Sequence, residues 1–166
     1  MIYFTADTHF GHTNIIKHCN RPFKSGTQMD RALLAEINTV VGKDDTLYVL
    51  GDFAWRNADL YLQKIACDHV HLIIGNHDKH SECFETEQYW LYLRLTKLYL
   101  SHYPHVSWPM KSHHAIHLYG HTHGTIEDEL DKIWPGRHSM DVGVDNVYRL
   151  FGRYRPISLN EVLTLF

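Results

Sequence analysis

Short apolar runs and helical patterns alternate along the first half of the chain. Residues 2–6, 46–50 and 70–74 are apolar runs of strand length, whereas apolar residues recur at helical spacing over 29–41. A second helix is expected over 58–67. Alternation of strands and helices predicts parallel strand–helix–strand units with right-handed crossovers.

The pattern changes in the second half of the chain. Residues 85–100 mix aromatic and polar positions, which we interpret as a short helix followed by two extended segments. Further strands are expected near 115–119 and 139–144. Ser158 and Glu161 have the spacing of a capping box, which predicts a short helix at the C-terminal end of the sequence.

Composition narrows the class of protein without identifying it. The 166 residues, 44% of them hydrophobic and 21% charged, suit one globular domain over 1–166, with no repeat or linker. A net charge of −3 predicts no broad nucleic-acid surface. No apolar run approaches the roughly 20 residues of a membrane helix and no signal peptide is recognisable, so we expect no membrane partner and a cytoplasmic location. No feature specifies an oligomeric state.

The three cysteines have wide spacing and form no C-x-x-C pair. This argues against a disulfide framework and against a thiolate zinc site, and it fits a reducing compartment. We expect Cys19, Cys67 and Cys83 to be small buried side chains; a reactive nucleophile is the alternative.

Residues that bind metal ions follow five apolar runs directly. They are Asp7 and His9 after the first run, Asp52 after the second, Asn76 after the third, His102 after residues 98–101, and His121 and His123 after residues 116–120. The carboxyl ends of strands are where open α/β sheets place their sites. Seven such residues at five strand ends therefore predict one crevice that holds metal.

The motifs around these residues resemble those of the calcineurin-like metallophosphoesterase superfamily. In chain order they are Asp7-Thr8-His9, Gly51-Asp52, Gly75-Asn76-His77-Asp78, Ser101-His102 and Gly120-His121-Thr122-His123. The resemblance covers essentially the whole chain and suggests a small single-domain phosphoesterase. It implies an α/β fold, a four-layer sandwich of two mixed β-sheets flanked by helices.

The resemblance also implies two sets of metal ligands that share one residue. Asp7, His9, Asp52 and His123 would bind one ion, and Asp52, Asn76, His102 and His121 would bind the other. Imidazole and oxygen ligands suit two divalent ions, Mn²⁺ first, with Fe, Zn²⁺, Co²⁺ or Ni²⁺ as alternatives. Two ions carry about +4, from which two aspartates and a bridging hydroxide remove about 3, so a phosphate would be attracted.

Phosphoester hydrolysis is the reaction that these implied ligands support. A hydroxide between the metals would attack phosphorus in line. His77 is the candidate for giving a proton or a hydrogen bond to the leaving oxygen, with a structural role as the alternative. Asp52, as the bridging ligand, is counted with it as catalytic.

Residues near Asp52 depart from the pattern of related phosphatases. Trp55 occupies the position of an aspartate that supports the catalytic histidine, and Asp78 or Asp59 could substitute for it. Arg56 matches the phosphate-contacting arginine of the family, although Asn57 replaces the usual glycine. A solvated loop arginine is the alternative for Arg56.

The segment after the first ligands carries further candidates for substrate contact. His12, Asn14 and Arg21 could recognise substrate at the rim of the site. Alternatively, Thr13 or Asn14 caps a short helix, and Arg21 fixes a turn.

Three groups outside the motifs have a structural and a functional interpretation. Tyr89, Trp90 and Tyr92 could stack on a nucleobase, but core packing is the expected role. Asp141 could support a ligand histidine, but a role in closing the sheet is favoured. His113 and His114 are expected in a polar turn.

We therefore expect a phosphodiesterase acting on a small nucleotide-like or metabolite diester. In the family, a histidine at the position of His9 is associated with diester cleavage, and this chain has no dedicated substrate domain. A phosphomonoesterase and a non-catalytic metal-binding scaffold are the alternatives. A nuclease on long DNA or RNA is disfavoured by the acidic charge balance.

Overall fold

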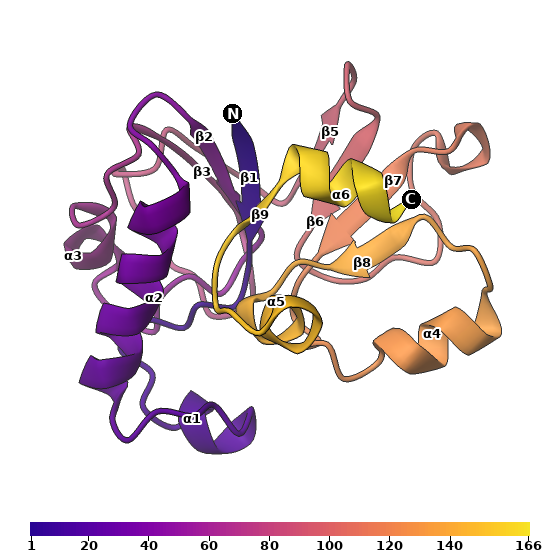
Figure 1. Cartoon of the computed structure of the whole chain (residues 1–166). Coiled ribbons are helices and arrows are strands. Elements are labelled where there is room, and N and C mark those ends of the chain that lie inside the picture. Colours follow the sequence, from indigo (N-terminus) through magenta and orange to yellow (C-terminus); the bar gives the residue numbers. More distant parts are fainter.

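The computed structural model describes residues 1–166 and arranges their strands in two sheets (Figure 1). The first sheet contains β1 (Ile2–Thr5), β2 (Thr46–Val49), β3 (His69–Ile73), β4 (Thr86–Gln88) and β9 (Ile157–Ser158), in the order β4-β3-β2-β1-β9. The second contains β5 (Trp90–Leu93), β6 (Leu98–Ser101), β7 (Ile116–Tyr119) and β8 (Ser139–Asp141), in the order β5-β6-β7-β8. β9 and β5 are antiparallel to their neighbours and all other pairs are parallel, so both sheets are mixed.

Helices flank the sheets, as expected for an α/β protein. They are α1 (Ile15–His18), α2 (Gly26–Val40), α3 (Ala58–Leu62), the 3₁₀ helix η1 (Lys111–His113), α4 (Glu127–Ile133), α5 (Val144–Phe151) and α6 (Leu159–Leu165). The predicted capping box is confirmed, because Ser158 and Glu161 bond reciprocally at the start of α6. No helix is both long and apolar enough to cross a bilayer.

Alternate side chains along the strands of the first sheet pack into two separate hydrophobic cores. In β1, Tyr3 belongs to one apolar cluster and Phe4 to another. Leu47 and Val49 of β2 join the first cluster, whereas Leu50, just past the strand, joins the second. Successive side chains of a strand point to opposite faces, so the first sheet is buried on both sides.

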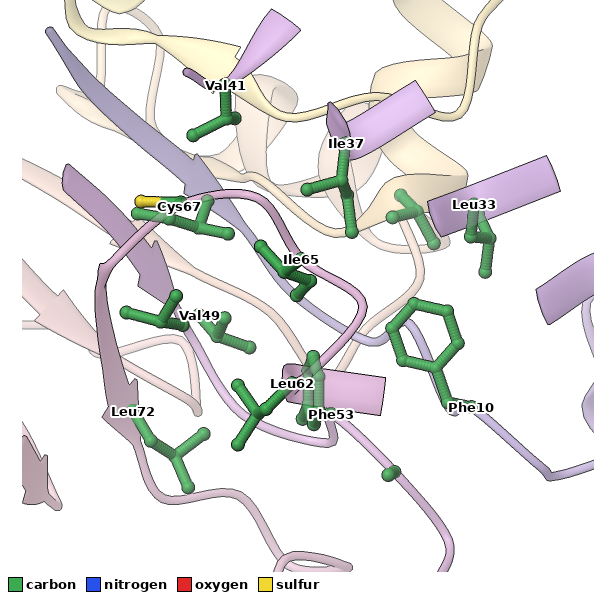
Figure 2. Close-up of a cluster of buried hydrophobic side chains, with 14 of the residues drawn as sticks. Phe10, Leu33, Ile37, Val41, Val49, Phe53, Leu62, Ile65, Cys67 and Leu72 are labelled. Atoms are coloured by element: carbon green, nitrogen blue, oxygen red, sulfur yellow. The ribbon is translucent and has the colours of Figure 1, made fainter. Parts of the chain in front are cut away.

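The first core lies between this sheet and α2. Met29, Leu33 and Ile37, spaced along one face of α2, are buried against the strands. Figure 2 shows Leu33 and Ile37 in one cluster with Val49 and Phe53. Helical spacing of apolar residues thus covers one face of the sheet.

The second core fills the space between the two sheets. Phe4 and Ile73 of the first sheet are clustered there with Leu98 and Leu118 of the second, and all four are fully buried. The outer face of the second sheet carries a smaller cluster around Trp108. The sheets are therefore held face to face, which fixes the ends of their strands relative to one another.

Two predictions about secondary structure are corrected by the model. Residues 85–100 contain no helix, because β4 pairs with β3 and β5 pairs with β6, so the segment passes from one sheet to the other in extended form. The helix expected over 58–67 ends at Leu62. The Asn38 side chain bonds to the Lys64 carbonyl and the Ala66 amide, so these backbone groups are paired with a side chain and not with a continuing helix.

Several expectations of burial are also corrected. Tyr89 and Trp90 are 74% and 56% exposed, so core packing is wrong for both; they lie at the edges of the sheets. Cys67 is buried as expected, but Cys83 is exposed. His113 lies in the exposed turn around η1, as predicted.

Shortening a core side chain on α2 tests the packing of this helix. Ile37→Ala removes three buried carbon atoms and should lower the free energy of unfolding by about 2–5 kcal/mol, measured by urea denaturation. Arg31→Ala, on the exposed face of the same helix, is the matched control and should change it by less than about 0.5 kcal/mol. Equal effects of the two substitutions would contradict the packing of α2 on the sheet.

Candidate metal centre

The structure brings all seven predicted metal ligands to one edge of the sandwich. Asp7, His9 and His123 have ligand atoms within 4.8 Å of one another, and so do Asp52, His102 and His121. The seventh residue joins the second group, because Asn76 Oδ1 lies 3.0 Å from His102 Nε2. These are the two sets that the resemblance implied.

Asp52 lies between the two groups. Its Oδ2 atom is 3.6 Å from His9 Nε2 and 3.6 Å from His102 Nε2. Ligands on one ion with bonds of about 2.0–2.2 Å lie about 3–3.5 Å apart. One carboxylate oxygen therefore faces both groups, as a bridging ligand would.

Each of the two aspartates has one oxygen fixed by the backbone. Asp7 Oδ2 accepts the amide of His121 at 2.9 Å, and Asp52 Oδ1 accepts the amide of His77 at 2.9 Å. The other oxygens, Asp7 Oδ1 and Asp52 Oδ2, are left to face the centre. Asp7 and Asp52 thus tie the ligand-bearing loops together and still offer a ligand atom each.

Most ligands at this edge have a left-handed backbone conformation. Five of the seven ligands have positive φ: Asp7 (56°), His9 (51°), Asp52 (54°), His121 (69°) and His123 (50°). Each non-glycine residue in this region costs about 1–3 kcal/mol and persists only where surrounding contacts impose it. Such strain gathers at functional sites, and here it turns the side chains of successive loops toward one point.

Glycines before the ligands permit their close approach. A Cβ on Gly51 would overlap the ring of His102, and one on Gly120 would lie 2.6 Å from Asp7 Oδ2. Gly51 also has a φ of 89°, which only glycine adopts readily. Steric crowding therefore explains why glycine precedes Asp52 in the Gly-Asp motif and His121 in the Gly-His motif.

Unpaired polar atoms show that these residues fit a metal. Asp7 Oδ1 and both ring nitrogens of His9 are buried without a hydrogen-bond partner. Buried polar groups in folded proteins are nearly always paired, and an unpaired one indicates an ion or water. Imidazole nitrogens and carboxylate oxygens are ligands for Mn²⁺, Fe or Zn²⁺.

Partners outside the ligand set fix which ring nitrogen faces the centre. His102 Nδ1 donates to the carbonyl of Leu50 at 2.8 Å, and His123 Nδ1 donates to Asp145 Oδ2 at 2.7 Å. In each ring Nε2 is left as the ligand atom. Metal-binding histidines are typically oriented in this way.

Asp145 is itself held by a buried arginine. Arg21 Nε and Nη2 bond to the two carboxylate oxygens at 2.9 and 2.7 Å, and Arg21 Nη2 also donates to the Asp7 carbonyl at 2.6 Å. One guanidinium therefore connects the turn after β1 with the partner of His123. Arg21 is only 3% exposed, so the prediction that it contacts substrate at the rim is corrected.

Burial and neighbouring charges set the protonation of the histidines in the first group. Burial, followed by the charges of His123 and Arg21, lowers the pKa of His9 to about 2 and leaves a neutral imidazole. Burial opposes protonation of His123, but its hydrogen bonds to Asp145 and Cys19 outweigh this effect and raise its pKa to about 11. A metal at His123 would therefore displace a proton.

His77 stands beside the centre, between the Asp52 carboxylate and the Trp55 ring. Its Nε2 lies 4.0 Å from Asp52 Oδ2, and its ring centroid is 5.1 Å from that of Trp55. The proposed substitutes are corrected: Asp78 accepts the amides of Asp52, Phe53 and Gly75, and Asp59 accepts the Ser81 hydroxyl. Neither carboxylate bonds to His77.

The three candidates for substrate contact have different positions. His12 stacks on Trp55 at 4.3 Å and lies 5.4 Å from the His9 ring, with its Nδ1 unpaired. Arg56 is exposed and lines a cavity of about 310 Å³ together with His77. Asn14 is exposed at the start of α1 and makes no capping bond, so the helix-cap alternative is wrong for its side chain. A substrate role for each stays a prediction.

Sequence reasoning missed two residues of the site. Asp145 was overlooked in favour of Asp141, which instead accepts the Thr122 hydroxyl and the amides of Gly124 and Gly143. Tyr103 bonds to Asn76 Oδ1 at 3.2 Å, and its ring lies 4.4 Å from that of His121. The signals were weak: Asp145 lies four residues after Asp141, and Tyr103 directly follows a ligand.

Replacing Asp145 tests its support of His123. Asp145→Asn keeps the shape but removes the charge, so Mn²⁺ affinity, measured by calorimetry on metal-stripped protein, should fall about 10–100-fold. Asp128→Asn, at an exposed carboxylate, is the control and should leave affinity unchanged. Wild-type affinity in Asp145→Asn would contradict the role of this carboxylate.

The chain has relatives that match most of its length. No family model matches it. The Gene 66 protein of Mycobacterium phage D29 is 27% identical over 161 residues, covering 75% of this chain and 79% of that protein. The crystal structure of AQ665 from Aquifex aeolicus, a protein of unknown function, superposes with a TM-score of 0.78 at 27% identity over 100% of this chain and 99% of that one. The uncharacterized protein MJ1445 of Methanocaldococcus jannaschii is 35% identical over 168 residues, covering 99% of this chain and 90% of that protein, and the chain belongs to the same family as MJ1445.

Proposed function

We propose that the protein is a phosphodiesterase with a dinuclear metal centre, of the calcineurin-like metallophosphoesterase type. The observation that carries this proposal is the convergence of seven imidazole and oxygen ligands from five strand ends, in two groups that Asp52 joins. The fold, with two mixed sheets flanked by helices, is compatible with that superfamily.

Charge at the centre favours an anionic substrate. Asp7 and Asp52 are the only carboxylates among the seven ligands, and Asn76 contributes a neutral oxygen. Two divalent ions, Mn²⁺ foremost, would thus keep a positive charge after binding. When bound, such ions supply a water-derived nucleophile and withdraw charge from the phosphate oxygens.

The residues beside the centre suit the binding of a phosphate ester. The cavity of about 310 Å³ that Arg56 and His77 line also contains Asn76 and Lys79. Arg56 and Lys79 bring two positive charges to this cavity, against the one carboxylate of Asp78, which bonds to backbone amides. Asn57 has a φ of 53°, so it adopts the left-handed conformation of the glycine that it replaces and leaves the turn after Arg56 intact. In the proposed function, Arg56 is the residue that would contact a phosphate oxygen.

In this proposal, His77 is the residue that protonates the leaving oxygen. Its side chain is 37% exposed, so substrate can reach the ring, while its amide is fixed by Asp52 Oδ1. Trp55 and His12 pack beside the ring and limit its movement in place of the missing carboxylate. Asp52 Oδ2, 4.0 Å from His77 Nε2, is the carboxylate oxygen beside the ring.

Comparison of a diester with a monoester tests the reaction. Metal-stripped protein reloaded with Mn²⁺ should hydrolyse bis-p-nitrophenyl phosphate with a higher kcat/KM than p-nitrophenyl phosphate. Stripped protein should hydrolyse neither. A preference for the monoester would overturn the diester assignment, and absence of turnover with two ions bound would overturn the proposal.

Removing the imidazole of His77 tests its role as a proton donor. His77→Ala should keep two Mn²⁺ ions and lower kcat for the diester by about 10²–10⁴-fold. His80→Ala removes a nearby exposed histidine that is paired with Glu87 and should leave kcat unchanged. Wild-type turnover in His77→Ala would reduce His77 to a structural residue.

A further inference from the structure

A second cavity, of about 510 Å³, lies on the outer face of the second sheet. Its walls come from the segment after β6 and from α4 with the loop that follows it. In Figure 1 this segment and α4 lie on the side of β7 and β8 that is away from the first sheet. None of the seven metal ligands lines it. Ligand pockets commonly have volumes of about 300–1,000 Å³.

This cavity adjoins the metal centre through both of its walls. Pro104, on one wall, is two residues after His102, so their Cα atoms are no more than about 7 Å apart. Ile126, on the other wall, also lines the cleft that contains His121 and His123. The cavity therefore lies near the metal centre.

Aromatic faces are the main recognition element of the cavity. Trp108 and Trp134 both line it, with several aliphatic side chains around them. Trp108 is buried, its indole N–H is bonded to the Ala115 carbonyl at 2.8 Å, and Lys111 lies over its ring, so Trp108 lines the cavity without a free donor. Trp134 is 40% exposed and thus accessible to a ligand. Such walls suit a planar ring.

Lys111 is the cation that remains free to bind a ligand. Its Nζ lies 4.7 Å from the ring centre of Trp108 and 5.8 Å from that of Trp134, and its one bonded partner is the Val106 carbonyl. Arg137, by contrast, is paired with Glu127 and Asp131. A planar ring in this cavity would therefore meet an ammonium group with N–H donors to spare, which favours rings that carry hydrogen-bond acceptors.

We propose that this cavity binds the nucleobase of a nucleotide diester whose phosphate lies at the metal centre. A nucleobase is planar and carries carbonyl or ring-nitrogen acceptors, and its sugar links it to the phosphate. The inference rests on the proposed function and narrows its substrate to nucleotides.

Two ligands that differ only in the base test the proposal. Adenosine 5′-monophosphate and ribose 5-phosphate are titrated into Mn²⁺-reloaded protein by calorimetry. The nucleotide should bind about ten- to hundredfold more tightly, as expected for one stacked base. Equal affinity of the two, or binding of neither, would overturn the proposal.

Substitutions locate the base within the cavity. Trp134→Leu should remove most of the affinity advantage of the nucleotide, and Lys111→Gln should reduce it. Trp90→Leu and Lys132→Gln, which replace an exposed tryptophan and an α4 lysine outside the cavity, should preserve it. An advantage that survives in Trp134→Leu would place the base elsewhere and overturn the inference.

Hydrolysis of bis-p-nitrophenyl phosphate separates this inference from the proposed function. Diester turnover without a base-dependent gain in affinity would overturn the nucleobase site and leave the phosphodiesterase in place. A gain in affinity that depends on Trp134, without turnover of any diester, would support the nucleobase site and count against the enzyme.

Discussion

The site depends on buried carboxylates that bind the backbone amides of neighbouring loops. Asp7 accepts the amide of His121, and Asp52 accepts that of His77, so each links two strand ends across the edge of the sandwich. Asp78 and Asp141 make similar bonds to loop amides without facing the centre. Of the five ligands with a left-handed backbone, Asp52 and His121 have their amides held by these carboxylates. Local preference alone would not select that backbone.

The positions of the predicted ligands could be read from the sequence because they follow from periodicity. Apolar runs identify strands, and polar residues directly after parallel strands meet at one edge. Asp145 could not be found in this way, since its partners Arg21 and His123 lie 124 and 22 residues away along the chain. The two extended segments over 85–100 were predicted, but the short helix before them was wrong, because pairing of β4 with β3, rather than local composition, decides the conformation there.

Trp55 stands where related phosphatases have an aspartate, so it packs against His77, the proposed proton donor, and offers it no carboxylate. An aspartate at this position would fix one ring nitrogen of His77 by a hydrogen bond, whereas Trp55 and His12 only pack beside the ring. Packing restricts where the imidazole lies.

Strain and unpaired polar atoms at the centre link folding to metal binding. The left-handed backbone at the ligands lowers the stability of the folded chain, and burial of Asp7 and His9 without partners adds to that cost. Ions that bind only the folded chain would offset it, by about 4 kcal/mol at a free concentration a thousandfold above Kd. The two sheets are joined by an apolar core that involves none of these ligands, so the core would hold the ligands oriented for a metal ion. Pre-organisation of this kind accounts for a site in which most ligands occupy costly conformations.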